Sequence, residues 1–173
     1  MIKIVQKENK VLRQIAEEVQ KDDIKSPKIK KILEDMKIAL ASQDDGVAIA
    51  APQIDIPLRI FVVSGKVHGI INPDEKDKNF PDMVFINPEI VKFSKKREMM
   101  EEGCLSERYF YGKVYRFSKA TVRALDENGD EFTRGGTGLM AQIFQHEIDH
   151  LNGILFSDKS EDLVEIPPEK TQR

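Results

Sequence analysis

The chain is organised around one stretch, Gln145-His146-Glu147-Ile148-Asp149-His150-Leu151. Two histidines four residues apart lie on the same face of a helix, so both imidazoles can point at one ion. The glutamate beside the first histidine is then within reach of a water bound to that ion. This H-E-x-x-H spacing is typical of zinc hydrolases, in which two ligands and one general base share a single rigid element.

The segment from Leu139 to Leu151 is predicted to be a buried helix, because apolar residues cover most of its circumference. Burying its polar side chains without partners would cost several kcal/mol, a cost that a bound cation can offset. The segment therefore favours a metal site over a chance match to the pattern. The apolar residues are Leu139, Met140, Ile143, Phe144, Ile148 and Leu151, and the polar ones include His146, Glu147, Asp149 and His150.

Asp149 is a carboxylate on this mostly buried helix, so it needs a cationic partner. We predict that Arg116, in the strand-like region before the helix, is that partner.

Length and composition indicate one globular domain over residues 1–173, with a polar tail from about residue 160 whose end we expect to be disordered. The chain is 40% hydrophobic and 33% charged, and its net charge of −3 gives no sign of direct nucleic-acid binding. No apolar run approaches the roughly 20 residues of a membrane span, and the N-terminus has no signal or transit pattern. A single cysteine, Cys104, excludes an internal disulfide. We therefore expect a cytoplasmic protein without a membrane partner.

Apolar residues at helical spacing predict two core helices in the N-terminal part. The first, over residues 11–19, is expected to be amphipathic. Ser26-Pro27 is a typical N-cap and first-turn pair for the second. The apolar positions are Val11, Leu12, Ile15, Ala16 and Val19 in the first helix, and Ile29, Ile32, Leu33, Met36 and Leu40 in the second.

Strand patterns dominate the middle of the chain. Leu58–Val63 reads as a buried strand, and Met83–Phe93 as one or two strands interrupted at Asn87-Pro88. Between them, residues 68–82 are predicted to form a surface loop in which His68 is exposed. Asn128-Gly129 predicts a hairpin. The fold class is therefore α+β, with antiparallel sheets packed around a central buried helix that carries the H-E-x-x-H motif.

The segment Gly46-Val47-Ala48-Ile49-Ala50-Ala51-Pro52-Gln53 alternates small and branched residues. No lysine or serine follows it as in a phosphate-binding loop, so nucleotide binding is not indicated. Close approach of the backbone to a ligand and tight core packing explain the segment equally well.

A catalytic zinc-type site usually has three protein ligands, so the helix lacks one. In the extended metalloprotease pattern a third histidine follows Gly153, but Phe156 stands at that position, which excludes this class. Cys104 is the favoured ligand, because Gly103 lets the backbone come close, although an inert core thiol is the alternative. Downstream candidates lie in the polar tail, and they are Glu161, Glu165 and Glu169.

The chain resembles the peptide deformylases in three separated motifs. Gly46 to Gln53 is similar to the family's G-φ-G-φ-A-A-x-Q, Glu102 to Ser106 to its E-G-C-L-S, and Gln145 to Gly153 to its Q-H-E-x-D-H-L-x-G. The likeness extends through residues 4–19 and 86–90, so it covers nearly the whole chain.

The resemblance implies hydrolysis of the N-formyl group from the initiator methionine of nascent polypeptides, with release of formate. It implies Cys104, His146 and His150 as ligands of one divalent metal, typically Fe²⁺ in the cell, with Zn²⁺ or Ni²⁺ also able to bind. The metal would activate a water, and Glu147 would move its proton to the departing amine. The partners implied are formyl-Met peptides and nascent chains at the ribosome.

The resemblance also gives the first two motifs a function. The Gln53 amide and the Leu105 backbone N–H would donate to the developing oxyanion. An apolar pocket for the methionine side chain is expected beside the metal, although core packing explains its apolar residues equally well. The substrate-binding candidates are Gly46, Val47, Ala48, Leu139 and Ile143.

Two departures from the family pattern concern the groove. Ala48 replaces the usual second glycine, and the alternating pattern around it predicts an extended backbone with negative φ. Glu107-Arg108 replaces an apolar residue and a proline, so the groove rim is expected to bind peptides differently.

Two other functions compete with deformylation. An H-E-x-x-H metallopeptidase would share the helix and base but needs a downstream ligand. A non-catalytic protein of the same fold could bind peptide N-termini or the ribosome, but it would have no use for Glu147 as a general base.

Overall fold

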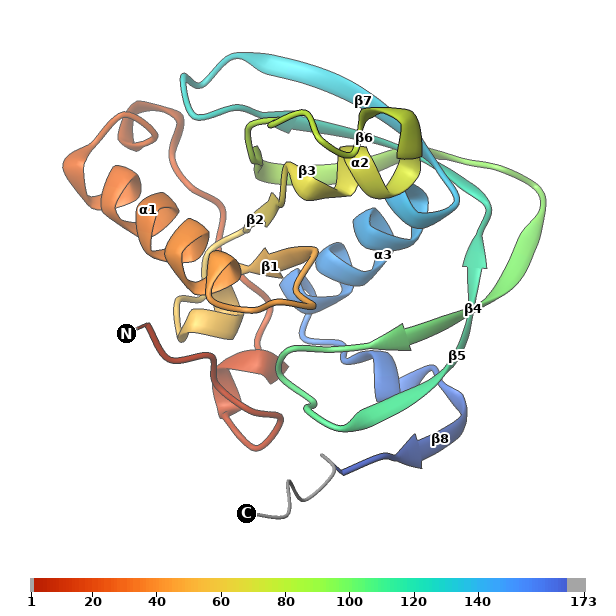
Figure 1. Cartoon of the computed structure of the whole chain (residues 1–173). Coiled ribbons are helices and arrows are strands. Elements are labelled where there is room, and N and C mark those ends of the chain that lie inside the picture. Colours follow the sequence, from red (N-terminus) through yellow and green to blue (C-terminus); the bar gives the residue numbers. More distant parts are fainter. Residues whose placement is uncertain (1, 168–173) are drawn as a thin grey trace.

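The computed structural model describes residues 2–167 and has two antiparallel sheets arranged around helix α3 (Figure 1). The larger sheet has the strand order β1-β2-β3-β6-β7, and the smaller has the order β4-β5-β8. Because α3 contacts strands of both sheets, the predicted α+β fold with a central helix is confirmed. The helices are α1 (Pro27–Ala41), α2 (Lys66–Ile71) and α3 (Leu139–Leu151).

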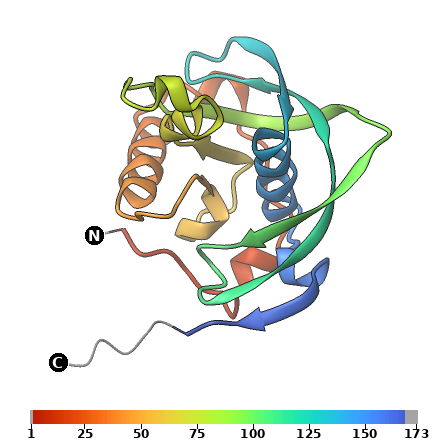
Figure 2. The same cartoon turned by 45° about the vertical axis from the view of Figure 1, so that its right-hand side comes forward.

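The larger sheet packs its inner face on α3, and α1 covers its other side (Figure 2). Phe61, Phe85 and Phe144 are fully buried where the sheet meets α3, with ring centroids 4.4 to 6.4 Å apart. This aromatic cluster fixes α3 on the sheet. The strands of this sheet are β1 (Ala48–Ala50), β2 (Ile60–Val63), β3 (Met83–Phe93), β6 (Lys119–Leu125) and β7 (Glu131–Thr137).

The smaller sheet closes over the opposite side of α3. Its strands are β4 (Arg97–Gly103), β5 (Phe110–Phe117) and β8 (Glu161–Glu165). Strand β4 runs directly into Cys104, so this sheet carries the cysteine motif to the helix. Within the predicted polar tail, residues 161–165 form a strand that pairs with β5 and whose residues are all exposed. The end of the tail that was predicted to be disordered, residues 168–173, lies outside the described residues.

Local signals that need no distant partner are confirmed. The Ser26 side chain accepts a hydrogen bond from the Ile29 N–H and caps α1, whose predicted apolar face is buried. Gly129 has φ of +80° in the predicted β6–β7 hairpin. The predicted break at Asn87 is an irregularity within the single strand β3, where Asn87 has φ of +50°.

The predicted amphipathic helix over residues 11–19 is wrong. Only a 3-10 turn, Lys10–Arg13, forms, and Ile15 is 76% exposed. The following backbone is extended because distant groups take its hydrogen bonds. The Ala16 N–H donates to the Leu151 carbonyl at 2.9 Å, and the Val19 N–H donates to the Asn87 side chain at 2.8 Å.

The prediction of a surface loop over residues 68–82 also needs correction. The region includes most of α2 and a 3-10 turn, Pro73–Glu75. His68 is half-buried: its Nε2 lies 2.6 Å from Glu75 Oε2, and its ring packs on Phe80 at 3.7 Å between centroids. These tertiary contacts order a segment whose composition is typical of a loop.

Among residues 2–167, no helix combines the length and the apolar character needed to cross a membrane.

Candidate metal centre

Helix α3 and the end of β4 bring three potential ligands together. The donor atoms of Cys104, His146 and His150 all lie within 4.8 Å of one another, and Cys104 Sγ is 3.2 Å from His150 Nε2. The two imidazoles project from successive turns of α3, with ring centroids 5.0 Å apart. One thiolate and two imidazoles are a donor set suited to a divalent transition metal, with room for a further ligand. The residues therefore fit a metal.

The downstream glutamates are not part of this cluster. Glu161 and Glu165 are exposed on β8, and Glu169 lies outside the described residues. The geometry therefore favours Cys104 over the described downstream candidates.

A buried ion cluster lies behind the ligands. Arg116 makes a bidentate contact with Glu102, at 2.7 and 2.9 Å, and its Nη1 is 2.6 Å from Asp149 Oδ2. The pairing expected between Arg116 and Asp149 is thus present. Lys159 also donates to both Asp149 oxygens, at 2.7 and 2.8 Å.

Glu102 connects this cluster to the candidate metal ligands, because its Oε2 is 3.0 Å from His146 Nδ1. Burial opposes ionisation of Glu102, but the hydrogen bonds from Arg116 and His146 outweigh it and lower the pKa from 4.5 to about 2. An ionised Glu102 can accept a hydrogen bond from His146 Nδ1, which would leave Nε2 available to coordinate a metal.

Glu147 and His150 each have a buried polar atom that has no hydrogen-bond partner among residues 2–167. These atoms are Glu147 Oε2 and His150 Nδ1. Burial raises the pKa of Glu147 from 4.5 to about 7, and it lowers the pKa of His150 well below 6.5. The first shift suits a group that exchanges protons near neutrality, and the second favours the neutral imidazole that binds metals.

A cavity of about 300 Å³ opens in front of the cluster, and all three sequence motifs contribute to it. Every residue predicted to bind substrate lines this cavity, and so do both predicted oxyanion donors. Cys104, His146 and Glu147 line it as well. Arg116 and Asp149 lie behind it. The predicted substrate-binding and oxyanion residues that line it are Gly46, Val47, Ala48, Gln53, Leu105, Leu139 and Ile143.

Gln53 is held with its amide N–H₂ directed at the site. Its Oε1 accepts from the Ala50 N–H at 2.8 Å, so Nε2 is the end that donates to the cysteine loop. Nε2 lies 3.2 Å from Ser106 Oγ and 3.7 Å from Cys104 Sγ, and the side chain is only 1% exposed. Gln53 is therefore a fixed donor beside the ligand cysteine.

Ala48 lies in β1, where it pairs with Val63, and it is not among the residues with positive φ. The extended backbone predicted for Ala48 is thus confirmed. The residue packs in the core cluster with Phe61 and Phe144 and also lines the cavity.

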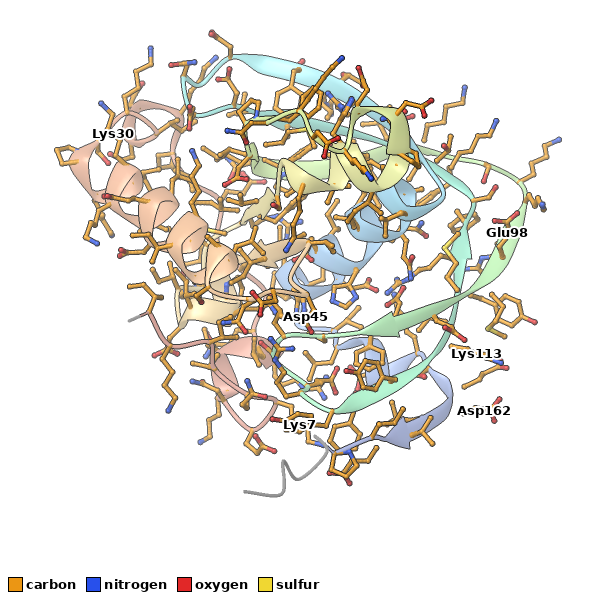
Figure 3. All side chains as sticks on the ribbon, in the orientation of Figure 1. Lys7, Lys30, Asp45, Glu98, Lys113 and Asp162 are labelled. Carbon is orange, nitrogen blue, oxygen red and sulfur yellow. The ribbon has the colours of Figure 1, made fainter. Side chains whose placement is uncertain are left out.

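The second departure is Glu107-Arg108, of which only Arg108 lies at the cavity mouth, where it pairs with Asp45. Arg108 Nη1 is 2.7 Å from Asp45 Oδ2, and Nη2 binds the Gln43 amide oxygen. Figure 3 shows Asp45 between the start of β1 and the end of β4. Glu107 points the other way and is buried, with its Oε2 3.4 Å from the Ser157 N–H.

Sequence reasoning assigned no role to Glu102 or Lys159. Glu102 had a usable signal, since a carboxylate next to a ligand motif on an alternating strand can reach a ligand histidine. The sequence gave no sign of a role for Lys159, because it lies in a polar segment. The turn after α3 brings it back to Asp149.

Comparisons with known proteins agree with this geometry. Residues 1–165 match the family described as polypeptide deformylase. Peptide deformylase 2 of Clostridium acetobutylicum is 42% identical over 151 residues, covering 87% of this chain and 89% of that protein. The Met-Ala-Ser-bound class I type b peptide deformylase of Acinetobacter baumannii has a TM-score of 0.80 at 32% identity, covering 92% of this chain and 98% of that one. The actinonin-bound peptide deformylase of Synechococcus elongatus also scores 0.80 at 32% identity, covering 93% and 81%.

Proposed function

This chain belongs to the polypeptide deformylase family, which removes the N-formyl group from nascent chains, and we propose that Cys104, His146 and His150 form the metal centre of that reaction. One observation carries the proposal: the three donor atoms lie within 4.8 Å of one another, beside the buried, partnerless oxygen of Glu147. A divalent metal bound there supplies Lewis acidity, which activates water at neutral pH. We propose Fe²⁺ as the ion in the cell, with Zn²⁺ or Ni²⁺ able to replace it.

Glu147 is the proposed general base and acid. Its carboxylate follows His146 on α3 and lines the cavity, so it faces the place where a formyl group would enter. With a pKa of about 7, it can take a proton from the attacking water and return it to the departing amine without a large energetic mismatch.

Gln53 and Leu105 are the proposed donors to the oxyanion that forms as the formyl carbon becomes tetrahedral. Ala50 holds the Gln53 amide beside the cavity, and an N–H that donates to Ser106 Oγ or Cys104 Sγ would be redirected to the developing charge. The backbone N–H of Leu105 would approach from the cysteine loop, on the other side of the same cavity.

The apolar part of the cavity is the proposed methionine pocket. Val47, Leu139 and Ile143 line it, next to the His146 ring. The Acinetobacter baumannii relative binds Met-Ala-Ser, which supports a peptide beginning with methionine as the ligand of this cavity.

Glu102, Arg116 and Asp149 are proposed to hold α3 and His146 in position. Glu102 orients the His146 ring, while Arg116 ties Glu102 to Asp149, one residue before His150. A carboxylate behind a ligand histidine keeps the tautomer that coordinates through Nε2.

The metallopeptidase alternative lacks support, because the described downstream glutamates are exposed on β8 and do not belong to the group of donor atoms from Cys104, His146 and His150. Formate release from a formyl-Met peptide, measured alongside peptide-bond cleavage of the same substrate, tests the assignment. Metal analysis of protein purified without air accompanies the assay. Formate release that requires one bound metal per chain is expected; peptide cleavage without formate would overturn the proposal.

We further propose that the chain acts as a single domain in the cytoplasm, on nascent chains at the ribosome. Both sheets pack on one helix, which supports the single domain, and the substrate class supports the location.

A further inference from the structure

Val5, Gln6 and Lys7 are successive residues of the N-terminal segment, and each contacts a residue that lines the cavity. The Val5 N–H donates to the Gln53 carbonyl at 2.9 Å, and Lys7 Nζ lies over the Phe110 ring at 3.7 Å. Between them, Gln6 Nε2 donates to the Leu105 carbonyl at 3.0 Å. Figure 3 shows Lys7 beside the start of β5.

The segment is anchored just before Gln6 by two apolar side chains, in addition to Lys7 after it. Ile4 packs on the core cluster that contains α1, and Val5 packs on Val11 and Leu155. The second end of the Gln6 amide is also engaged, since Oε1 accepts from the Arg108 N–H at 3.4 Å. Gln6 is therefore a fixed bridge across the loop that follows Cys104, with both ends of its amide in use.

The Leu105 carbonyl belongs to the same planar peptide as the Ser106 N–H. That N–H points at the ligand sulfur, with Ser106 N 3.4 Å from Cys104 Sγ. A hydrogen bond on the carbonyl fixes the plane of this peptide and polarises its N–H, which strengthens the bond to sulfur. Hydrogen bonds to a ligating thiolate tune the electronic properties of the metal it holds.

We infer that Gln6 is a positioning residue for the Cys104 thiolate, acting through the peptide that joins Leu105 to Ser106. It holds the carbonyl end of that peptide so that the other end donates to sulfur. The same contact fixes the loop that carries the Leu105 N–H. The inference rests on the proposed function, because it requires Cys104 to be a metal ligand.

Nickel-loaded protein provides a readout other than turnover, since a thiolate bound to Ni²⁺ gives a sulfur-to-metal charge-transfer band. Gln6→Glu keeps the size and the acceptor but removes the donor, and Gln6→Ala removes the donor without adding charge. Gln14→Glu and Gln14→Ala are matched controls, because Gln14 is exposed in the same part of the chain. Each protein is examined for band position, bound nickel, melting temperature, kcat and KM.

Both Gln6 variants are expected to shift the band to lower energy, because a weaker N–H···S bond leaves the sulfur lone pairs less stabilised. A fall in kcat of about tenfold with little change in KM should accompany the shift, a fraction of the loss caused by deleting an oxyanion donor. Bound nickel should match that of the Gln14 controls, and the melting temperature should stay well above the assay temperature, so that the protein is folded in every measurement.

An unchanged band in both Gln6 variants would overturn the inference. So would a fall in kcat that merely follows loss of nickel or of folded protein, since a purely structural tether predicts that result. Wild-type protein that shows no formate release and no thiolate band would instead overturn the proposed function.

Discussion

Two arginine–carboxylate groups flank the same cavity, and they differ chiefly in burial. The buried cluster, Arg116 with Glu102 and Asp149, lies behind the ligands, and its arginine side chain is 3% exposed. The rim pair, Arg108 with Asp45, lies at the cavity mouth, with side chains 29% and 61% exposed. Their contact distances are alike, at 2.6 to 2.9 Å in the cluster and 2.7 Å in the pair.

The difference shows that the N–O distance of an ion pair does not by itself indicate how much the pair contributes to stability. In the buried cluster Arg116 and Glu102 have lost almost all contact with water, so removal of Arg116 leaves the buried Glu102 carboxylate without its main cation. In the rim pair water and salt replace the partner at little cost. The buried cluster can therefore fix the geometry of the ligand helix, whereas the rim pair can only adjust access to the cavity.

Glu147 should give the largest effect, because it is buried like Glu102 but has no ion-pair partner in the described part of the chain. Glu147→Gln should retain the metal and its stability yet lose about 10²–10⁴-fold in kcat, the usual contribution of general acid–base catalysis. Steady-state kinetics and metal analysis on the same sample provide the measurement. Near-normal turnover would remove Glu147 from the mechanism.

Arg116→Met tests the buried cluster itself. It leaves Glu102 and Asp149 without their shared cation, so the free energy of unfolding should fall by about 3–5 kcal/mol. Urea unfolding of the metal-free protein measures this change, with Arg108→Met as the control. Equal losses in the two variants would refute the distinction between cluster and pair.

Glu102→Gln tests how the stability of the buried cluster depends on pH. The folded-state pKa of Glu102 is lowered to about 2, so its contribution to stability is complete above its ordinary pKa of 4.5 and is lost as pH falls towards 2. The wild-type protein should therefore lose about 3 kcal/mol more than the variant across this window. Unfolding curves of both metal-free proteins at several pH values measure the difference. Parallel stability profiles would show that Glu102 is not strongly paired.

Ala48→Gly tests whether the cavity wall needs glycine. Because Ala48 is already in an extended strand, the change should alter kcat/KM by less than about tenfold, or ~1.4 kcal/mol. Formyl-Met peptide kinetics provide the measurement. A hundredfold gain would mean that the alanine impairs this site.

Arg108→Ala should have the smallest effect. Loss of the exposed pair should cost only about 0–1 kcal/mol of unfolding free energy and leave kcat unchanged. Any effect should appear in KM for longer formyl peptides, because the pair stands at the mouth. A large fall in kcat with a short formyl-Met substrate would place Arg108 in the chemistry instead.

The sequence by itself determined the features that depend on neighbouring residues. The spacing of His146 and His150 places both on one face of any helix, the Ser26 cap begins α1, and Asn128-Gly129 forms its hairpin with no distant partner. The need of buried Asp149 for a cation also followed from composition, and Arg116 supplies it.

Only the tertiary structure decided the features that depend on residues far apart in the chain. The residues after Arg13 carry a helical pattern, yet Leu151 and Asn87 take their backbone hydrogen bonds and keep them extended. Glu102 reaches His146, and Gln6 reaches Leu105, only because folding brings together residues far apart in the chain. Local spacing fixes which face a side chain occupies, but the partner it meets depends on long-range packing, which no short window of sequence encodes.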